Sequence, residues 1–320
     1  MIPYHRAAVT LRKASSVIVC GHVRPDGDAV GSVLGMTLAL RAAGIPAVPT
    51  LADDRPAPST YAFLPGYSLY VAAADLATPD VFVALDTPVA ERLGEARPLM
   101  ESAGSVVVFD HHPGAVHYGA HCVCDPAMAA TGQIVWEFLQ ALEVTPTVEI
   151  ALPLYVALLT DTGRFSYDNT SAEAFRAAAQ MLEAGVDAAQ VARLVYQERT
   201  AGSLELEARA LSRLTLANNG RVAWTFLTDE DFVETGALPE EGEHLPDAIR
   251  VLGGVDVVML LRQRGSEVRG NLRAKTGADV GVIAQGFGGG GHRAAAGFTV
   301  APGAVPDVAL QVLAKLPGGE

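Results

Sequence analysis

One imidazole and two carboxylates lie within seven residues near the start of the chain: His22, Asp26 and Asp28. The apolar run 17–20 precedes them and the run 33–40, with helical spacing, follows them, which predicts a strand, a tight turn and a helix. Imidazole and carboxylate groups suit divalent metals such as Mg²⁺, Mn²⁺ or Zn²⁺. The two carboxylates, two positions apart, could point to different sides of the turn and serve two ions. A helix cap beside an ordinary Pro-Asp-Gly turn explains these three residues equally well.

Two later apolar runs, 81–85 and 105–109, end in similar side chains. Near-continuous apolar runs are typical of parallel strands buried on both faces. The carboxyl ends of such strands form the ligand-binding edge of an open α/β sheet. A shared site therefore explains the three clusters better than three separate turns do. The side chains that follow the two later runs are Asp86, Asp110, His111 and His112.

A fourth apolar element, residues 149–159, can be read as a buried helix or a buried strand. It stops at Asp161, and Arg164 follows three residues later. We expect this Asp to contribute a fourth part of the site, with a capped loop as the alternative. Residues 171–218 are rich in Ala, Leu and Glu and predict two or three helices.

The chain of 320 residues, half of them apolar, can bury a full core and predicts two domains. Its apolar runs are shorter than the roughly 18 to 20 residues that a membrane span needs. The first residues lack the apolar segment of an export signal, and three cysteines make no disulfide framework. These features predict a cytoplasmic protein without membrane contact.

The formal net charge of −13 argues against a broad basic surface that coats long nucleic acid, including long duplexes. Residues 250–293 are locally basic, and almost all basic side chains in the chain are arginines, which suit phosphate. Four consecutive glycines, 288–291, can aim backbone N–H groups at an anion. A flexible linker is the alternative, but the Ala-rich run that follows could open a packed helix and makes a linker less favoured.

In this order, the motifs resemble those of the DHH phosphoesterase family with a C-terminal DHHA1 domain. The resemblance covers the whole chain and implies an N-terminal parallel-sheet domain with helices on both faces, plus a smaller α/β domain. The implied bounds are 1–190 for the catalytic domain, 191–208 for a helical linker and 209–320 for the substrate-binding domain, with the active site in the cleft between the domains. The matching motifs are HVRPDGDAVGS (22–32), ALDTP (84–88), DHHP (110–113), TDTGRF (160–165) and GGGGHRAAAG (288–297).

The resemblance also implies a centre of two divalent ions, usually Mn²⁺, with Mg²⁺ or Co²⁺ as alternatives. One ion would be held by His22, Asp26 and Asp86, and the other by Asp28, His111, Asp161 and the bridging Asp86. His112 would face the scissile phosphate, while Asp110 would orient the imidazoles. Substrate-binding residues would be Arg164, Arg262, Arg273, Gly290, Gly291 and His292. The strand that usually reads Ser-Leu-Arg-Ser in this family is Asn271-Leu272-Arg273-Ala274, without either hydroxyl.

The implied activity is hydrolysis of short oligoribonucleotides to mononucleotides and removal of the 3′-phosphate of pAp. Short RNA or DNA oligonucleotides and pAp would be the substrates, and a homodimer stays open. The alternatives are a cyclic or linear dinucleotide (pApA) phosphodiesterase, a RecJ-type single-strand exonuclease and a non-catalytic nucleotide sensor. A pyrophosphatase with a lysine-rich phosphate grip is disfavoured, because Lys275 is the only lysine between Lys13 and Lys315.

Overall fold

The computed structural model describes residues 2–53, 56–275, 278–291, 293–316 and 318. The chain divides into two compact units, residues 1–197 and 198–320. This boundary falls inside the stretch 191–208 that the sequence suggests as a linker. Helix α7 (Ala188–Tyr196) belongs to the first unit and helix α8 (Ala201–Ser212) to the second. No described helix combines the length and the apolar character that a membrane crossing requires.

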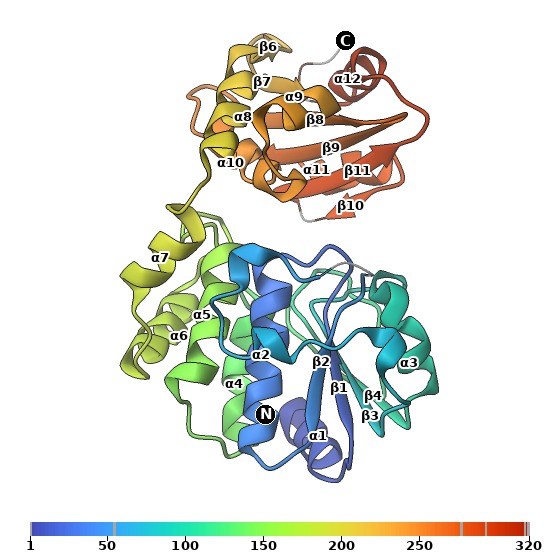
Figure 1. Cartoon of the computed structure of the whole chain (residues 1–320), viewed down its shortest axis with the longest axis vertical. Helices are drawn as coiled ribbons and strands as arrows, with labels where there is room; N and C mark the ends of the chain where they lie inside the picture. Colours follow the sequence, from blue (N-terminus) through green and yellow to red (C-terminus); the bar gives the residue numbers. More distant parts are fainter. Residues whose placement is uncertain (1, 54–55, 276–277, 292, 317, 319–320) are drawn as a thin grey trace. The chain divides into compact units, whose positions relative to one another are not determined.

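The first unit is built on a five-stranded sheet in which every neighbouring pair of strands is parallel. Its spatial order is β2-β1-β3-β4-β5 (Figure 1). The predicted strands at 17–20, 81–85 and 105–109 are confirmed, and β5 is an additional edge strand. The strands are β1 (Val17–Cys20), β2 (Ala47–Thr50), β3 (Val81–Leu85), β4 (Ser105–Asp110) and β5 (His121–Cys124).

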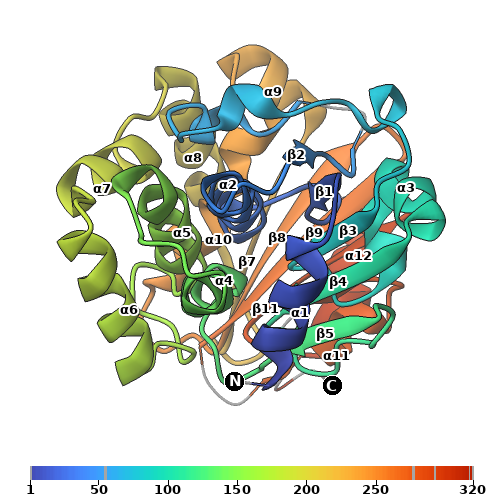
Figure 2. The same ribbon diagram turned by 90° about the horizontal axis from the view of Figure 1, so that it is seen from below.

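Both faces of this sheet are buried, as continuous apolar strands require. On one face, Val83 and Phe109 join a large core with the main helices, and on the other, Phe82 and Val108 join a smaller core. Figure 2 shows α2, α4 and α5 on one side of the strands and α3 on the other. The helices are α1 (Ile2–Arg12), α2 (Gly27–Ala42), α3 (Arg97–Ser102), α4 (Thr131–Ala141), α5 (Val148–Asp161) and α6 (Ala172–Glu183); the 3₁₀ segments are Ser59–Tyr61, Tyr67–Leu69, Ala73–Asp75 and Ala90–Ala96.

The ambiguous apolar element is helix α5, which packs closely on α2. Glycines at four-residue intervals on α2 allow this approach, because a Cβ on Gly31 would overlap Pro153 O and lie 2.9 Å from Ala157 Cβ. The close contact carries the first turn of α2, with Asp28, toward Asp161 at the end of α5. The sequence alone could not decide between helix and strand, since a short, wholly apolar run has no visible period.

The second unit holds a six-stranded mixed sheet of order β10-β11-β9-β8-β7-β6, in which only β7 and β8 pair in parallel. Helices α11 and α12 pack on one face, and α8 and α10 pack on the other. The strands are β6 (Thr215–Ala217), β7 (Val222–Leu227), β8 (Val257–Arg264), β9 (Glu267–Ala274), β10 (Gly290–Gly291) and β11 (Ala295–Val300); the remaining helices are α9 (Asp229–Thr235), α10 (Leu245–Arg250), α11 (Val280–Gln285) and α12 (Val305–Leu313), with a 3₁₀ segment at Pro239–Gly242.

The expectation of a helix after the glycine run is wrong. Residues 295–300 form β11, between β9 and β10. Phe298 explains why a strand forms here and not a helix. Its side chain is buried and stacks on Phe287, with 4.9 Å between the ring centroids. The buried Ala296 and Phe298 alternate with more exposed residues on the other face, which favours a strand over the helix propensity of alanine. Gly290 and Gly291 pair with this strand, so they are an ordered part of the sheet and not a linker.

Candidate metal centre

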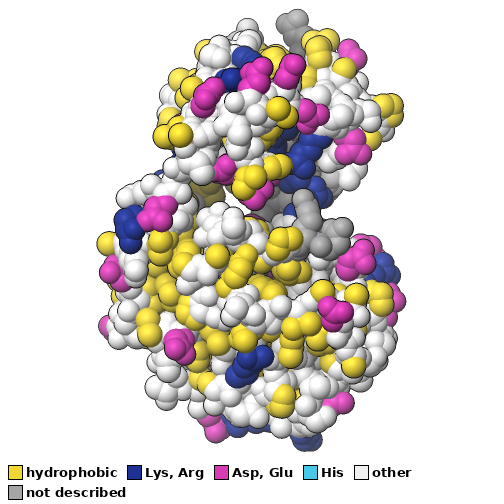
Figure 3. All heavy atoms as spheres, viewed as in Figure 1, with side chains coloured by type: hydrophobic (Ala, Val, Ile, Leu, Met, Phe, Trp, Pro, Cys, Tyr) yellow, Lys and Arg dark blue, Asp and Glu magenta, His cyan; other side chains and the backbone are white. Residues whose placement is uncertain are grey.

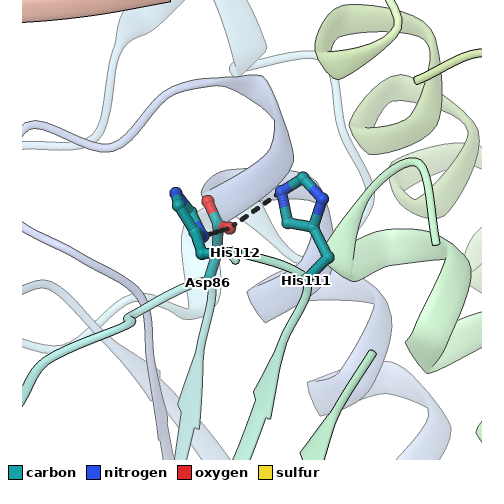
Figure 4. Close-up of side chains that lie close together, drawn as sticks. All are labelled: Asp86, His111 and His112. Carbon is teal, nitrogen blue, oxygen red and sulfur yellow. Dashed lines mark ion pairs between the residues drawn. The ribbon is translucent and has the colours of Figure 1, made fainter. Parts of the chain in front are cut away.

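Asp86 lies at the middle of the candidate site, directly after β3. Its Oδ1 atom is 3.6 Å from His111 Nε2 and 3.5 Å from His112 Nδ1, with the two rings on either side of the carboxylate (Figure 4). Its Oδ2 atom is 3.3 Å from His22 Nε2. The backbone of Asp86 has φ +56°, a left-handed conformation that costs energy and is often found at functional sites. Its N–H donates to Phe109 O, so the neighbouring strand holds it in this conformation.

Three groups of side chains bring their ligand atoms within 4.8 Å of one another. The structure therefore brings together, from β1, β3, β4, α2 and α5, every residue that the sequence suggests as a metal ligand. His112 also enters one group, in addition to the role expected for it at the phosphate. The groups are His22 with Asp26 and Asp86, Asp28 with His111 and Asp161, and Asp86 with His111 and His112.

Backbone carbonyls orient the imidazoles of two of these residues. His22 Nδ1 lies 2.8 Å from Val23 O, and His111 Nδ1 lies 3.3 Å from Met128 O. A carbonyl only accepts hydrogen bonds, so each Nδ1 must carry the proton. Each Nε2 then points at the carboxylates, which is the usual arrangement of a metal-ligating histidine.

The charges of the cluster also fit divalent cations. Burial and the neighbouring carboxylates raise the pKa of Asp28 and of Asp161 well above its ordinary value. Burial raises the pKa of Asp86 too, but hydrogen bonding to His22 and the nearby imidazoles together hold it well below its usual range. A cluster of buried carboxylates that repel one another is stabilised by bound cations. The donor set of imidazole and carboxylate groups suits Mn²⁺, Mg²⁺ or Zn²⁺.

The beginning of α4 holds the carboxylate of Asp28 in place. Thr131 N donates to Asp28 Oδ2 at 2.7 Å and Gly132 N donates to Asp28 Oδ1 at 2.9 Å. Ser32 adds a third donor, at 2.9 Å. The hydroxyl of Thr131 donates to Asp86 Oδ1 at 3.1 Å, so one fully buried residue positions two of the ligands. The sequence analysis did not single out Thr131, because its hydrogen bonds to Asp28 and Asp86 join segments far apart in the chain.

Asn169 is a second positioning residue that the sequence did not suggest. Its Nδ2 donates to Asp161 Oδ2 at 3.3 Å, to Asp161 O at 3.0 Å and to Ala129 O at 2.9 Å. It thereby ties the end of α5 to the segment before α4. The helix-cap reading of Asp26 is also correct, because its side chain accepts from Ala29 N at the start of α2 while facing His22 at 3.8 Å.

Asp110 contacts His112 in two ways. Asp110 Oδ1 accepts from His112 N at 2.6 Å and lies 2.9 Å from His112 Nδ1. Asp110 is fully buried, and its Oδ2 has no hydrogen-bond partner among the described residues. The contact orients the imidazole so that His112 Nε2 points away from Asp110.

The expected substrate-binding residues differ in their exposure and in their partners. Arg164 is exposed and its guanidinium lies over the ring of Tyr196 at 4.9 Å. Arg273 is partly exposed and pairs with Asp247 at 3.5 Å. Arg262 is fully buried and paired inside the second unit, so it has no surface with which to grip a substrate. His292 lies outside the described residues.

The fold and the site define the class of protein. The model of the DHH family, N-terminal domain, matches residues 16–159, and the DHHA1 domain matches residues 219–316. The chain belongs to the DHH phosphoesterase family.

Among its relatives, the bifunctional oligoribonuclease and PAP phosphatase NrnA of Thermus thermophilus is 34% identical over 89% of this chain and 84% of its own length. The protein of the same name from Bacillus subtilis is 25% identical over 91% of each chain. The crystal structure of an exopolyphosphatase-related protein from Bacteroides fragilis is similar in fold, with a TM-score of 0.88 and 22% identity over 98% of this chain and 95% of that one.

Proposed function

We propose that this protein is a metal-dependent phosphoesterase that hydrolyses short oligoribonucleotides to mononucleotides and removes the 3′-phosphate of pAp. The observation that carries the proposal is the arrangement of three ligand groups around Asp86, in a chain whose relatives are named for these two activities. Two Mn²⁺ ions are the proposed cofactors, one held by His22, Asp26 and Asp86, and the other by Asp28, Asp86, His111 and Asp161.

Different side chains have different roles in the proposed phosphoester hydrolysis. Bound at these positions, two divalent ions would supply a water of lowered pKa and a clamp for the phosphate oxygens. The Asp110 carboxylate orients the imidazole of His112. His112 Nε2 would then donate a hydrogen bond to the transferring phosphoryl group, whose charge increases in the transition state. Thr131 and Asn169 keep the carboxylates in position, which avoids reorganisation during the reaction.

The charge distribution supports short substrates. A chain of net charge −13 with arginines concentrated in residues 250–293 has a local basic patch for one or two phosphates, not for a long duplex. Lys and Arg side chains gather on the second unit around β8 and β9 in the view of Figure 3. We further propose that the enzyme acts in the cytoplasm.

Turnover of a substrate panel by the Mn²⁺-loaded protein tests this function. The panel contains pAp, a ribonucleotide dimer, pApA, long single-stranded DNA and pyrophosphate, at equal concentrations. We expect phosphate from pAp and mononucleotides from the dimer at the highest kcat/KM values. A preference for long DNA or for pyrophosphate would refute the proposal, and a preference for pApA alone would favour the dinucleotide phosphodiesterase alternative.

A further inference from the structure

Arg92 lies in the 3₁₀ segment Ala90–Ala96, which follows β3 and Asp86 at the carboxyl edge of the first sheet. Hydrogen bonds through Val23 connect this segment with the turn after β1. Val23 N donates to Arg92 O at 2.8 Å, and Val23 O lies 2.8 Å from His22 Nδ1. The same residue thus holds the imidazole of His22 and the backbone of Arg92, so Arg92 lies next to the proposed metal centre.

Tight packing keeps the 3₁₀ segment in this place. Leu93 is fully buried in the smaller core of the first unit, and Glu95 N donates to Ala52 O at 2.9 Å. Gly94 has φ +44°, and a Cβ there would overlap Ala52 O and lie 2.6 Å from Val23 Cγ1. The backbone that carries Arg92 therefore cannot move away from the turn without losing these contacts.

The side chain of Arg92 is half-buried and has no ion pair or hydrogen bond with another described residue. Its neighbour Glu91 pairs instead with Arg97, at 3.8 Å. A guanidinium carries five N–H donors and keeps its charge at any physiological pH. Arg92 thus has its donors free for an anion at the edge of the metal centre.

The charge of Arg92 acts on the metal centre itself. Burial lowers the pKa of His22, hydrogen bonds to Asp26 and Asp86 raise it, and the positive charge of Arg92 opposes that increase. The guanidinium is therefore close enough to interact with a charged group bound beside His22.

The balance of charges at the centre favours a phosphoryl group as this anion. The carboxylates of the proposed ligands already offset the charges of two divalent ions. A phosphoryl group brings further negative charge, which the transition state spreads over its non-bridging oxygens. The planar fork of an arginine matches two such oxygens. The carboxylates are those of Asp26, Asp28, Asp86 and Asp161.

We propose that Arg92 is a catalytic residue that donates its guanidinium N–H groups to the non-bridging oxygens of the phosphoryl group at the metal centre. This inference rests on the proposed function and adds to it a donor from the first unit. Because the contact is made to the phosphoryl group and not to the nucleoside, its loss should affect pAp and a ribonucleotide dimer by similar factors.

Arg92→Ala tests the inference by phosphate binding, metal content and turnover. We expect the Kd of inorganic phosphate for the Mn²⁺-loaded full chain to rise about tenfold or more, since hydrogen bonds between charged groups are among the stronger ones. The kcat/KM should fall about 10- to 100-fold for pAp and for the dimer. Bound Mn²⁺ per chain should stay as in the wild type, and guanidinium in solution should restore part of the turnover.

Arg6→Ala is the matched control, because Arg6 is exposed on α1 and undergoes the same chemical change. It should match the wild type and show no increase with guanidinium. Thermal unfolding checks the fold, and Arg92→Gln carries the binding and turnover tests if Arg92→Ala does not fold.

A phosphate Kd within twofold of the wild-type value would overturn the inference, as would a wild type that does not bind phosphate. Loss of bound Mn²⁺ from the Arg92 variant would also overturn it, since Arg92 would then only support the His22 turn. Failure of the proposed function would instead appear as wild-type protein that binds phosphate but turns over neither pAp nor the dimer.

Discussion

Protonation of His22 links the proposed metal centre to pH. Burial alone would lower its pKa, but hydrogen bonds to Asp26 and Asp86 raise the pKa from 6.5 to about 10. The imidazole is therefore protonated at pH 7 in the metal-free protein, and an ion at Nε2 must displace that proton. We expect Mn²⁺ binding to release protons, and the affinity to rise about tenfold per pH unit between pH 7 and 9 for each proton displaced.

Isothermal titration of Mn²⁺ in two buffers with different ionisation enthalpies measures the proton release. His22→Gln should release fewer protons at the same pH, by about one. An affinity that does not change between pH 7 and 9 would contradict the assignment of His22 as a ligand.

Variants of Thr131 test whether the first turn of α4 holds the proposed metal ligands in position. Thr131→Val keeps the shape of the side chain and the backbone N–H but removes the hydrogen bond to Asp86. Loss of such a supporting contact typically costs about 10- to 100-fold in metal affinity or activity. Thr131→Ser retains the hydroxyl and should stay close to wild type in a Mn²⁺ titration followed by electron paramagnetic resonance. Equal Mn²⁺ affinities for the Val and Ser variants would show that the hydroxyl has no such role.

At the scale of elements, the packing of α2 on α5 sets the spacing of the carboxylates. Gly31→Ala inserts a methyl group where Pro153 and Ala157 leave no room. Overpacking typically costs about 1 to 3 kcal/mol, more than the roughly 1 kcal/mol that alanine gains over glycine in a helix. We expect a lower melting temperature and weaker Mn²⁺ binding, because the two helices carry Asp28 and Asp161.

Gly253→Ala is the control, since apart from its chain neighbours no atom lies within 4 Å of the added Cβ. Equal melting temperatures and equal Mn²⁺ affinities for the two variants would refute the packing argument.

The sequence predicts the strands of the first sheet better than it predicts contacts between distant elements. Strands 81–85 and 105–109 are apolar except for Ser105, and acids or imidazoles follow them. Their pairing and the position of Asp86 therefore follow from the local pattern and sheet geometry. The burial of Arg262 does not follow, because it depends on Glu243 and Asn271, which reach it through tertiary packing. The hydrogen bond from Thr131 to Asp86 spans 45 positions and has no local signal.

At the scale of the whole molecule, the two units have separate cores, and we assign catalysis to one and substrate choice to the other. The first unit concentrates buried carboxylates and imidazoles, and the second carries the partly exposed Arg269 and Arg273 on strand β9. The net charge of −13 supports the proposal that long nucleic acid is not a substrate. In this account, catalysis depends on the first unit and substrate choice on the second.

Asp86→Asn provides the most direct test of the account. Asparagine tolerates the left-handed backbone at this position, so the fold should persist while the bridging charge is lost. Asp187→Asn is the control, because Asp187 is an exposed helix cap where asparagine serves equally well. Bound Mn²⁺ per chain and turnover of pAp should be measured on the same samples.

The account predicts two Mn²⁺ ions per chain in the wild type and in Asp187→Asn, with equal turnover. It predicts fewer than two ions in Asp86→Asn and a loss of turnover of at least about a thousandfold, at an unchanged melting temperature of the metal-free protein. Asp86→Asn protein that still binds two ions and turns over pAp at near the wild-type rate would contradict a metal centre bridged by Asp86.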